Sequence, residues 1–234
     1  MRFTSVGRVH PERADVNFDR IILEPTSGGK IAIRCEASQL HVNADIPDVD
    51  DPITAFIAAK HIAQTIVSAL GFALGTGYSV EMVQLIDEGG NSIVFGVRPG
   101  NLAFSPWLEL FEATKNLIKK DFFFRFALQD YCQAMQSEID CAFYCYRAIE
   151  AIKSAFHSNT CRDGWPAFHS ALGTQRKEID SVVKDYADPI RHGNWFEQKP
   201  TTASQRNAML LLTRNILHKY LEYMKTESAP GSGV

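Results

Sequence analysis

Arginine and histidine meet in the second half of the chain in a pattern that suits phosphate chemistry. The run Asp185–Trp195 contains Arg191 and His192, followed by Asn194 and Trp195. A guanidinium binds phosphate oxygens through planar paired donors, and an imidazole titrates near neutral pH. One interpretation is therefore a site in which Arg191 holds a phosphate and His192 moves a proton. The alternative is a helix junction in which Arg191 pairs with a carboxylate and His192 donates to a carbonyl.

A charged pair lies in the aromatic and apolar stretch that precedes this run. Arg147 and Glu150 are three residues apart, so they share one face of a predicted helix. Because their neighbours are apolar, we expect the pair to find a partner across a helix bundle, with Arg191 the candidate partner of Glu150. The alternative is an exposed pair within the helix, which stabilises it by roughly a few tenths of a kcal/mol.

The sequence predicts no metal site and no cofactor. Cys141 and Cys145 share a helical face, and Cys132 and Cys161 lie at some distance, without CxxC or HExxH spacing. Small apolar core residues explain these cysteines better. There is also no glycine-rich phosphate loop, nucleophile elbow or dinucleotide fingerprint. An odd number of cysteines, with no apolar signal core at the N-terminus, predicts a cytoplasmic protein with reduced thiols.

The first half of the chain is predicted to form a small antiparallel sheet with one helix. Two hairpins are predicted by short β-branched runs that flank glycine-containing turns: Phe18–Glu24 with Lys30–Glu36, and Tyr78–Ile86 with Ser92–Val97. Weaker strand patterns cover Arg2–Val9 and Leu40–Ile46. Asp51 is a good N-cap, Pro52 a favoured first residue, and Gly71 to Gly77 end the helix. Residues 1–105 are thus predicted to form an α+β domain that senses or recruits a protein partner.

From residue 106 onward the apolar period is helical. Residues 106–226 predict an all-α, up-down helical bundle, which makes the whole chain α+β. Its expected helices are Pro106–Ile118, Phe122–Gln136, Ser137 or Glu138 to His157, Asp163–Gly173, Thr174–Ala187 and Ser204–Lys225. Asp188 before Pro189 predicts a cap where the chain restarts, and residues 227–234 are expected to be disordered.

Composition limits the classes of function. The 234 residues are 45% hydrophobic and 22% charged, with a formal net charge of −3, as in ordinary globular proteins. The longest apolar stretch, Ile53–Leu74, is interrupted by Lys60, His61 and Gln64, so we expect a buried helix and no membrane contact. Residues 1–105 carry a net charge of −4 and residues 106–234 of +1. Neither part is basic enough for long-range nucleic-acid binding, so any RNA contact must be local.

Residues of about 106–226 resemble the HEPN family of helical domains, which occurs in bacterial toxins, antiphage defence proteins and RNA-processing factors. The resemblance rests on three segments: FYCYRAIEAI (143–152), WPAFHSALG (165–173) and YADPIRHG (186–193). It implies a bundle that forms a homodimer and binds RNA or a nucleotide. The candidate binding residues are Arg147, Trp165, His169, Asn194 and Trp195.

Catalytic members of that family cleave RNA without a metal, through an Arg and a His four to six residues apart. His192 matches the family's His-Gly, but Asp185, Tyr186 and Ala187 stand where that arginine is expected. One literal match, Arg162 to His169, has no weight because about one is expected by chance. The resemblance therefore implies a non-catalytic binding, dimerisation or regulatory module of a toxin or antiphage-defence system. The alternative is a metal-independent endoribonuclease with a variant site of Arg191, His192 and Glu150.

Overall fold

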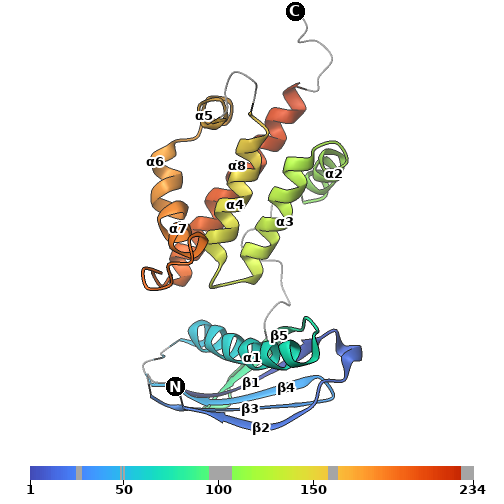
Figure 1. The fold of residues 1–234 in the computed structure, drawn as a ribbon, viewed down its shortest axis with the longest axis vertical. Helices are drawn as coiled ribbons and strands as arrows, with labels where there is room; N and C mark the ends of the chain where they lie inside the picture. Colours follow the sequence, from blue (N-terminus) through green and yellow to red (C-terminus); the bar gives the residue numbers. More distant parts are fainter. Residues whose placement is uncertain (25–27, 48, 50, 95–106, 158–162, 228–234) are drawn as a thin grey trace, which may run out of the picture. The chain divides into compact units, whose positions relative to one another are not determined.

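The chain folds into two compact units, Met1–Asn101 and Leu102–Val234, each with its own hydrophobic core. The computed structural model describes residues 1–234 except 25–27, 48, 50, 95–106, 158–162 and 228–234. The predicted fold class is confirmed: an antiparallel sheet with one helix is followed by a helical unit (Figure 1). The tail expected to be disordered lies outside the described residues, apart from Glu227, which is helical.

The first unit is a six-stranded antiparallel sheet with the order β2-β3-β4-β1-β5-β6. Its strands are β1 (Arg2–His10), β2 (Phe18–Leu23), β3 (Lys30–Glu36), β4 (Gln39–Asp45), β5 (Ser79–Asp87) and β6 (Ser92–Val94). Both predicted hairpins are present, and residues 95–97 of the last predicted strand lie outside the described residues. The weak strand pattern at the N-terminus turns out to be β1, which pairs with both β4 and β5.

Helix α1 (Pro52–Leu74) lies along one face of this sheet (Figure 1). The Asp51 carboxylate accepts hydrogen bonds from the backbone N–H groups of Ile53 and Thr54, as its N-cap position predicts. The buried residues of the helix recur every fourth position: Ala55, Ala59, Ala63, Val67 and Gly71. These small side chains let the helix approach the sheet closely. On the opposite face the side chains of Arg2, Lys30 and Arg34 are exposed, so we call it the open face.

Helix α1 was expected to be buried, and the structure buries one of its faces. The outer face exposes Ile53, Phe72 and Leu74. Among the described residues, α1 is the one helix long and apolar enough to cross a membrane, and 22% of its most apolar window is buried. A helix that packs on a sheet meets the same criterion, so length and composition do not decide between the two roles.

The second unit is helical. Its elements are α2 (Trp107–Ile118), α3 (Phe122–Gln136), α4 (Cys141–Ser154), α5 (Trp165–Leu172), α6 (Arg176–Ile179), the π-helical segment η2 (Asp180–Lys184), α7 (Asp185–Arg191) and α8 (Ala203–Glu227). Helix α4 packs against both α3 and α8 and has seven buried residues, more than any other helix described in this unit. It is also shorter than predicted at both ends, since it begins at Cys141 and ends at Ser154.

The prediction that Asp188 caps a new segment is wrong. The chain stays helical from Arg176 to Arg191, through the π-helical segment and through Pro189. Proline removes one backbone donor, but the helix ends two residues later, so little of the hydrogen-bond ladder is lost. The Asp188 side chain is used by Lys184 and Arg191 instead of by a backbone N–H.

Candidate functional site

Tyr146 and Glu150 lie one turn apart on α4 and face the helical segment that ends at Arg191. Side chains four residues apart on a helix are neighbours, so the two form one surface. The Tyr146 ring is almost fully buried, and the Glu150 side chain is about one-third exposed. Burial and, after it, the Glu150 charge raise the pKa of Tyr146 to about 12, so its phenol keeps its proton at neutral pH.

Arg191 closes this surface from α7. Its Nη2 lies 3.5 Å from Glu150 Oε2, its Nη1 lies 3.2 Å from Asp188 Oδ1, and its Cζ lies 4.9 Å from the Tyr146 ring centroid. The expected contact between Glu150 and Arg191 across the bundle is therefore confirmed. The guanidinium meets two carboxylates and a ring face, with 28% of its side chain exposed. It ties α7 to α4.

Lys184 completes the group. It lies one helical turn before Asp188, and its Nζ is 2.5 Å from Asp188 Oδ2. We call Tyr146, Glu150, Lys184, Asp188 and Arg191 the Arg191 cluster. Partial burial raises the pKa of Asp188, but Lys184 and then Arg191 outweigh burial, so the net shift of that pKa is downward. The Asp188 carboxylate is therefore ionised at neutral pH. The cluster has two cations and two anions, and each cation is paired with a carboxylate, so no unpaired cation is left for a ligand.

His192 does not join this cluster. It is exposed at the C-terminal end of α7, where its backbone N–H donates to the Asp188 carbonyl at 3.1 Å. Within the described part of the chain, its ring makes no hydrogen bond or ion pair. Arg191 turns into the bundle and its neighbour His192 does not, as expected for adjacent residues about 100° apart on a helix. The two side chains therefore do not converge on one point.

Asn194 and Trp195 follow in the connection to α8. The Asn194 backbone N–H donates to the Pro189 carbonyl at 2.8 Å, which fixes the turn after the helix. Trp195 is 60% exposed, and Phe196 beside it is fully exposed. Large exposed aromatic side chains at a helix end are suited to contact with a partner or a base. The candidate binding residues at this end thus lie on the surface outside the Arg191 cluster.

Arg147 has a different partner from the one that its spacing suggests. Its Nη2 lies 3.1 Å from Asp130 Oδ1 on α3, and its guanidinium also lies over the rings of Phe143 and Tyr144. The intrahelical pair with Glu150 is absent from the described residues, because each member is drawn to a neighbouring helix. Asp130 is only 10% exposed, and this burial raises its pKa although the Arg147 charge lowers it. Arg147 is thus a tie between α3 and α4.

Trp165 and His169 lie on α5, with their rings stacked at a centroid distance of 5.4 Å. The His169 Nδ1 lies 2.8 Å from Thr174 Oγ1, while its buried Nε2 has no hydrogen-bond partner among the described residues. Burial lowers the pKa of His169, and the Arg176 charge lowers it further, so the ring is neutral at physiological pH. A histidine in this state is a packing residue more than a proton donor.

A small cavity of about 20 Å³ joins α5 to the Arg191 cluster. It is lined by Tyr146, Trp165, Arg176, Ile179, Asp180 and Lys184. This volume holds about one water molecule and no substrate. The adjacent segment η2 is a π-helix, a rare geometry that is frequent at functional sites. Three of the lining residues, Arg176, Asp180 and Lys184, were missed by sequence reasoning, although their spacing of four marks a common helix face.

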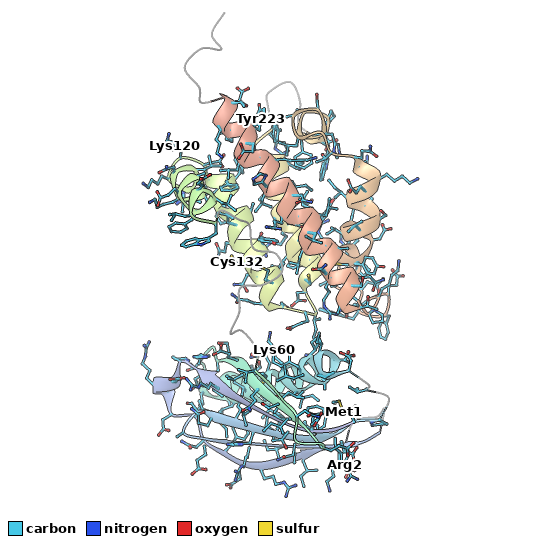
Figure 2. The ribbon with its side chains drawn as sticks, turned by 180° about the vertical axis from the view of Figure 1, so that it is seen from behind. Met1, Arg2, Lys60, Lys120, Cys132 and Tyr223 are labelled. Carbon is cyan, nitrogen blue, oxygen red and sulfur yellow. The ribbon has the colours of Figure 1, made fainter. Side chains whose placement is uncertain are left out.

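Four cysteines lie in the described part of the chain: Cys35, Cys132, Cys141 and Cys145. No group of three or more His, Cys, Asp or Glu side chains that could hold a metal occurs among the residues that the structure describes. Cys141 and Cys145 are buried in the core, as expected, whereas Cys132 on α3 (labelled in Figure 2) is exposed, contrary to expectation. Cys161 and the Arg162 of the literal Arg–His match lie outside the described residues.

The fold and the site together define a two-unit α+β protein whose chemistry-bearing residues lie mostly between helices. Residues 3–95 match the N-terminal domain model, and residues 109–225 the C-terminal domain model, of a family described as a domain of unknown function, DUF8168. The chain therefore belongs to the DUF8168 family. No curated protein and no solved structure matches it. Family membership confirms the two-part organisation and assigns no activity.

Proposed function

We propose that this protein is a non-catalytic, HEPN-like module that binds RNA or a nucleotide and acts in a toxin or antiphage-defence system of the cytoplasm. The observation that best supports a non-catalytic role is that the Arg191 guanidinium is already ion-paired with Glu150 and Asp188. The helical unit would form the homodimer. The sheet unit would sense a signal or recruit a protein partner.

The engagement of Arg191 argues against cleavage of RNA. Metal-independent cleavage needs a free cation to stabilise the charge that develops on the phosphorane, and an imidazole within hydrogen-bond reach of the 2′-hydroxyl. In this protein a phosphate would have to displace two carboxylates from Arg191. His192 also lies outside the Arg191 cluster, so the two groups do not share a reacting atom within one chain.

Exposed aromatic residues support a binding role. Trp195 and Phe196 are exposed, and Lys199, a few residues later in the same connection, has its Nζ 5.8 Å from the Tyr186 ring centroid. Unpaired bases stack on such rings, and nearby cations hold the phosphate backbone. The near-neutral net charge of the unit is compatible with a short RNA end or a nucleotide more than with long duplexes.

The test is incubation of the purified full-length protein with total RNA in EDTA. The proposal expects no cleavage at any protein concentration, and retention of a short fluorescent RNA that is weakened in Trp195→Ala. Cleavage that disappears in His192→Ala would establish instead the variant endoribonuclease of Arg191, His192 and Glu150.

A purely structural role for the Arg191 cluster is tested with the same preparations. Arg191→Ala should lower the melting temperature, because it leaves Glu150 and Asp188 without their shared partner. A variant that melts normally but loses RNA would show that Arg191 binds the ligand and is not a tie. Light scattering of the wild-type protein tests the homodimer, which predicts twice the chain mass of 26.2 kDa.

A further inference from the structure

The face of the sheet opposite α1 carries charged and polar side chains at one end, together with apolar ones such as Ile22 and Ile86. Strand register aligns side chains of neighbouring strands on this face in rows. One row contains Lys30 of β3, Asp45 of β4 and Arg2 of β1, and the next contains Ala32, Asn43 and Thr4. Figure 2 shows Arg2 and Met1 close together at one end of the sheet. The two rows therefore bring cations and hydrogen-bonding groups to this end of the open face.

A hollow of about 380 Å³ lies over these rows. Small-molecule sites usually have volumes of about 300–1,000 Å³, so the hollow can hold a small metabolite. Ala32 explains its depth, because a methyl group stands among long side chains and leaves space above the strand. Those side chains include Arg2, Arg20, Lys30, Ile86 and Glu88.

The lining has three cations, Arg2, Arg20 and Lys30, and three acids, Asp45, Asp87 and Glu88, but not every cation is paired. Arg2 Nε lies 2.9 Å from Asp45 Oδ2, so this pair satisfies itself. The Asp87 carboxylate accepts hydrogen bonds from the backbone and the side chain of Asn91 at 2.8 and 2.9 Å. Within the described residues, Arg20 and Lys30 make no ion pair. The β2–β3 side of the hollow therefore carries two cations that an anion can neutralise.

Neutral donors lie beside these cations. The Thr4 hydroxyl donates to Asn43 Oδ1 at 2.9 Å, which orients the Asn43 amide and leaves its two N–H donors for a further partner. Backbone geometry also keeps the lysine in place: Gly29 has a φ of +91°, and a Cβ there would lie 2.3 Å from the Asp45 carbonyl oxygen. Only glycine fits this approach, and it fixes the start of β3 at Lys30.

We propose that this hollow binds a small organic anion, whose phosphate or carboxylate group is held by Arg20 and Lys30 and hydrogen-bonded by Asn43. The one aromatic residue of the lining, Phe3, belongs to the core beneath α1. A nucleobase would thus find no ring to stack on, and recognition rests on the acid group. This site is separate from the Arg191 cluster and does not depend on the function proposed for it.

Titration calorimetry of the full-length protein tests the site with three separate probes: orthophosphate, adenosine monophosphate and succinate. We expect saturable binding of at least one of them, with a dissociation constant between roughly 1 μM and 1 mM. Binding of the phosphate probes alone assigns a phosphate ligand, and binding of succinate assigns a carboxylate. Arg20→Gln and Lys30→Gln should each weaken binding about tenfold, the usual effect of losing one charged hydrogen bond.

Arg34→Gln is the matched control. Arg34 lies two residues after Ala32 on the same strand and is exposed, but it does not line the hollow. This variant removes the same charge and should bind as the wild type does. Ala32→Leu fills the hollow and should abolish binding while circular dichroism stays unchanged. The proposal is overturned if none of the probes binds at about 10 mM, or if Arg34→Gln weakens binding as much as Lys30→Gln does.

Discussion

Charged side chains are used differently in the two units. In the helical unit they lie between helices: Arg191 joins α7 to α4, and Arg147 joins α4 to α3. In the sheet unit they lie on an open face, where the side chains of Arg2 and Asp45 are 72% and 51% exposed. Exposed pairs stabilise a protein by about 0–1 kcal/mol, and buried ones are costly to break. In the helical unit these two arginines therefore join helices, whereas the sheet unit keeps charges available for a ligand.

The largest expected difference concerns two aspartates that cap helices, one in each unit. Asp121 caps α3 through the Phe124 backbone N–H and also accepts a 2.5 Å hydrogen bond from the buried Tyr220 hydroxyl. Asp121→Ala loses both interactions and should lower the free energy of unfolding by about 2–4 kcal/mol. Asp51 caps the exposed start of α1, and Asp51→Ala should cost about 1 kcal/mol.

Urea denaturation measures both effects. All three tryptophans lie in the helical unit, so their fluorescence follows Asp121→Ala, and circular dichroism follows both variants. Equal losses for the two aspartates would contradict the contrast between the units.

A smaller difference separates the neighbours Arg191 and His192. Arg191→Met removes the shared partner of Glu150 and Asp188, both about one-third exposed, and should cost about 1–2 kcal/mol. His192→Ala removes an exposed ring and should change the free energy of unfolding by less than about 0.5 kcal/mol. Tryptophan fluorescence in urea measures both variants. A larger loss for His192→Ala would mean that the histidine holds the fold.

The pH dependence sharpens the comparison within the helical unit. The folded state lowers the pKa of Asp188, so Asp188 contributes stability that is present above its unfolded pKa and is lost as pH falls. Burial raises the pKa of Asp130, so protonation of Asp130 favours the folded state. Between about pH 5 and pH 3, Asp188→Asn should lose less stability than the wild type, and Asp130→Asn should lose more. Thermal melts across this pH range measure the losses. A larger loss for Asp188→Asn than for Asp130→Asn would contradict the two pKa shifts.

The fold was predictable where its signals are local. Asp51 with Pro52, Asp121 before α3, and the glycine turn after Asp87 each fix a helix start or a hairpin through neighbouring residues. The π-helical segment η2 was not predictable, because nothing in Asp180–Lys184 distinguishes it from an ordinary helix. Arg147 pairs across the bundle as expected, but its partner Asp130 was not identified, because it is seventeen residues away on another helix.

The candidate site was predictable in part from the charges in its sequence. An acid embedded in apolar sequence needs a partner, and this argument correctly predicted the pairing of Glu150 with Arg191. Lys184 and Asp188 entered the Arg191 cluster because the helix continues through Pro189, which the sequence argued against. The hollow on the sheet was not predicted, because it depends on register: Ala32 is unremarkable until β3 pairs with β4 and its long-chain neighbours surround it.

The smallest expected effect concerns the open face of the sheet. Arg2→Gln breaks the exposed pair with Asp45 and should leave the urea midpoint of unfolding unchanged, because solvent screens exposed pairs. Urea denaturation followed by circular dichroism measures the change, with Arg34→Gln as the matched control. A lower midpoint for Arg2→Gln than for Arg34→Gln would show that the sheet unit also relies on the Arg2–Asp45 pair for stability.

The central claim is that Arg191 is occupied as a tie between α7 and α4. A double-mutant cycle of Arg191→Met and Glu150→Gln, read from tryptophan fluorescence in urea, tests it most directly. The structure predicts a coupling free energy of about 0.5–1.5 kcal/mol, because the two groups interact at 3.5 Å in a partly buried setting. Strictly additive costs would contradict the claim, since Arg191 would then be free to act on a ligand.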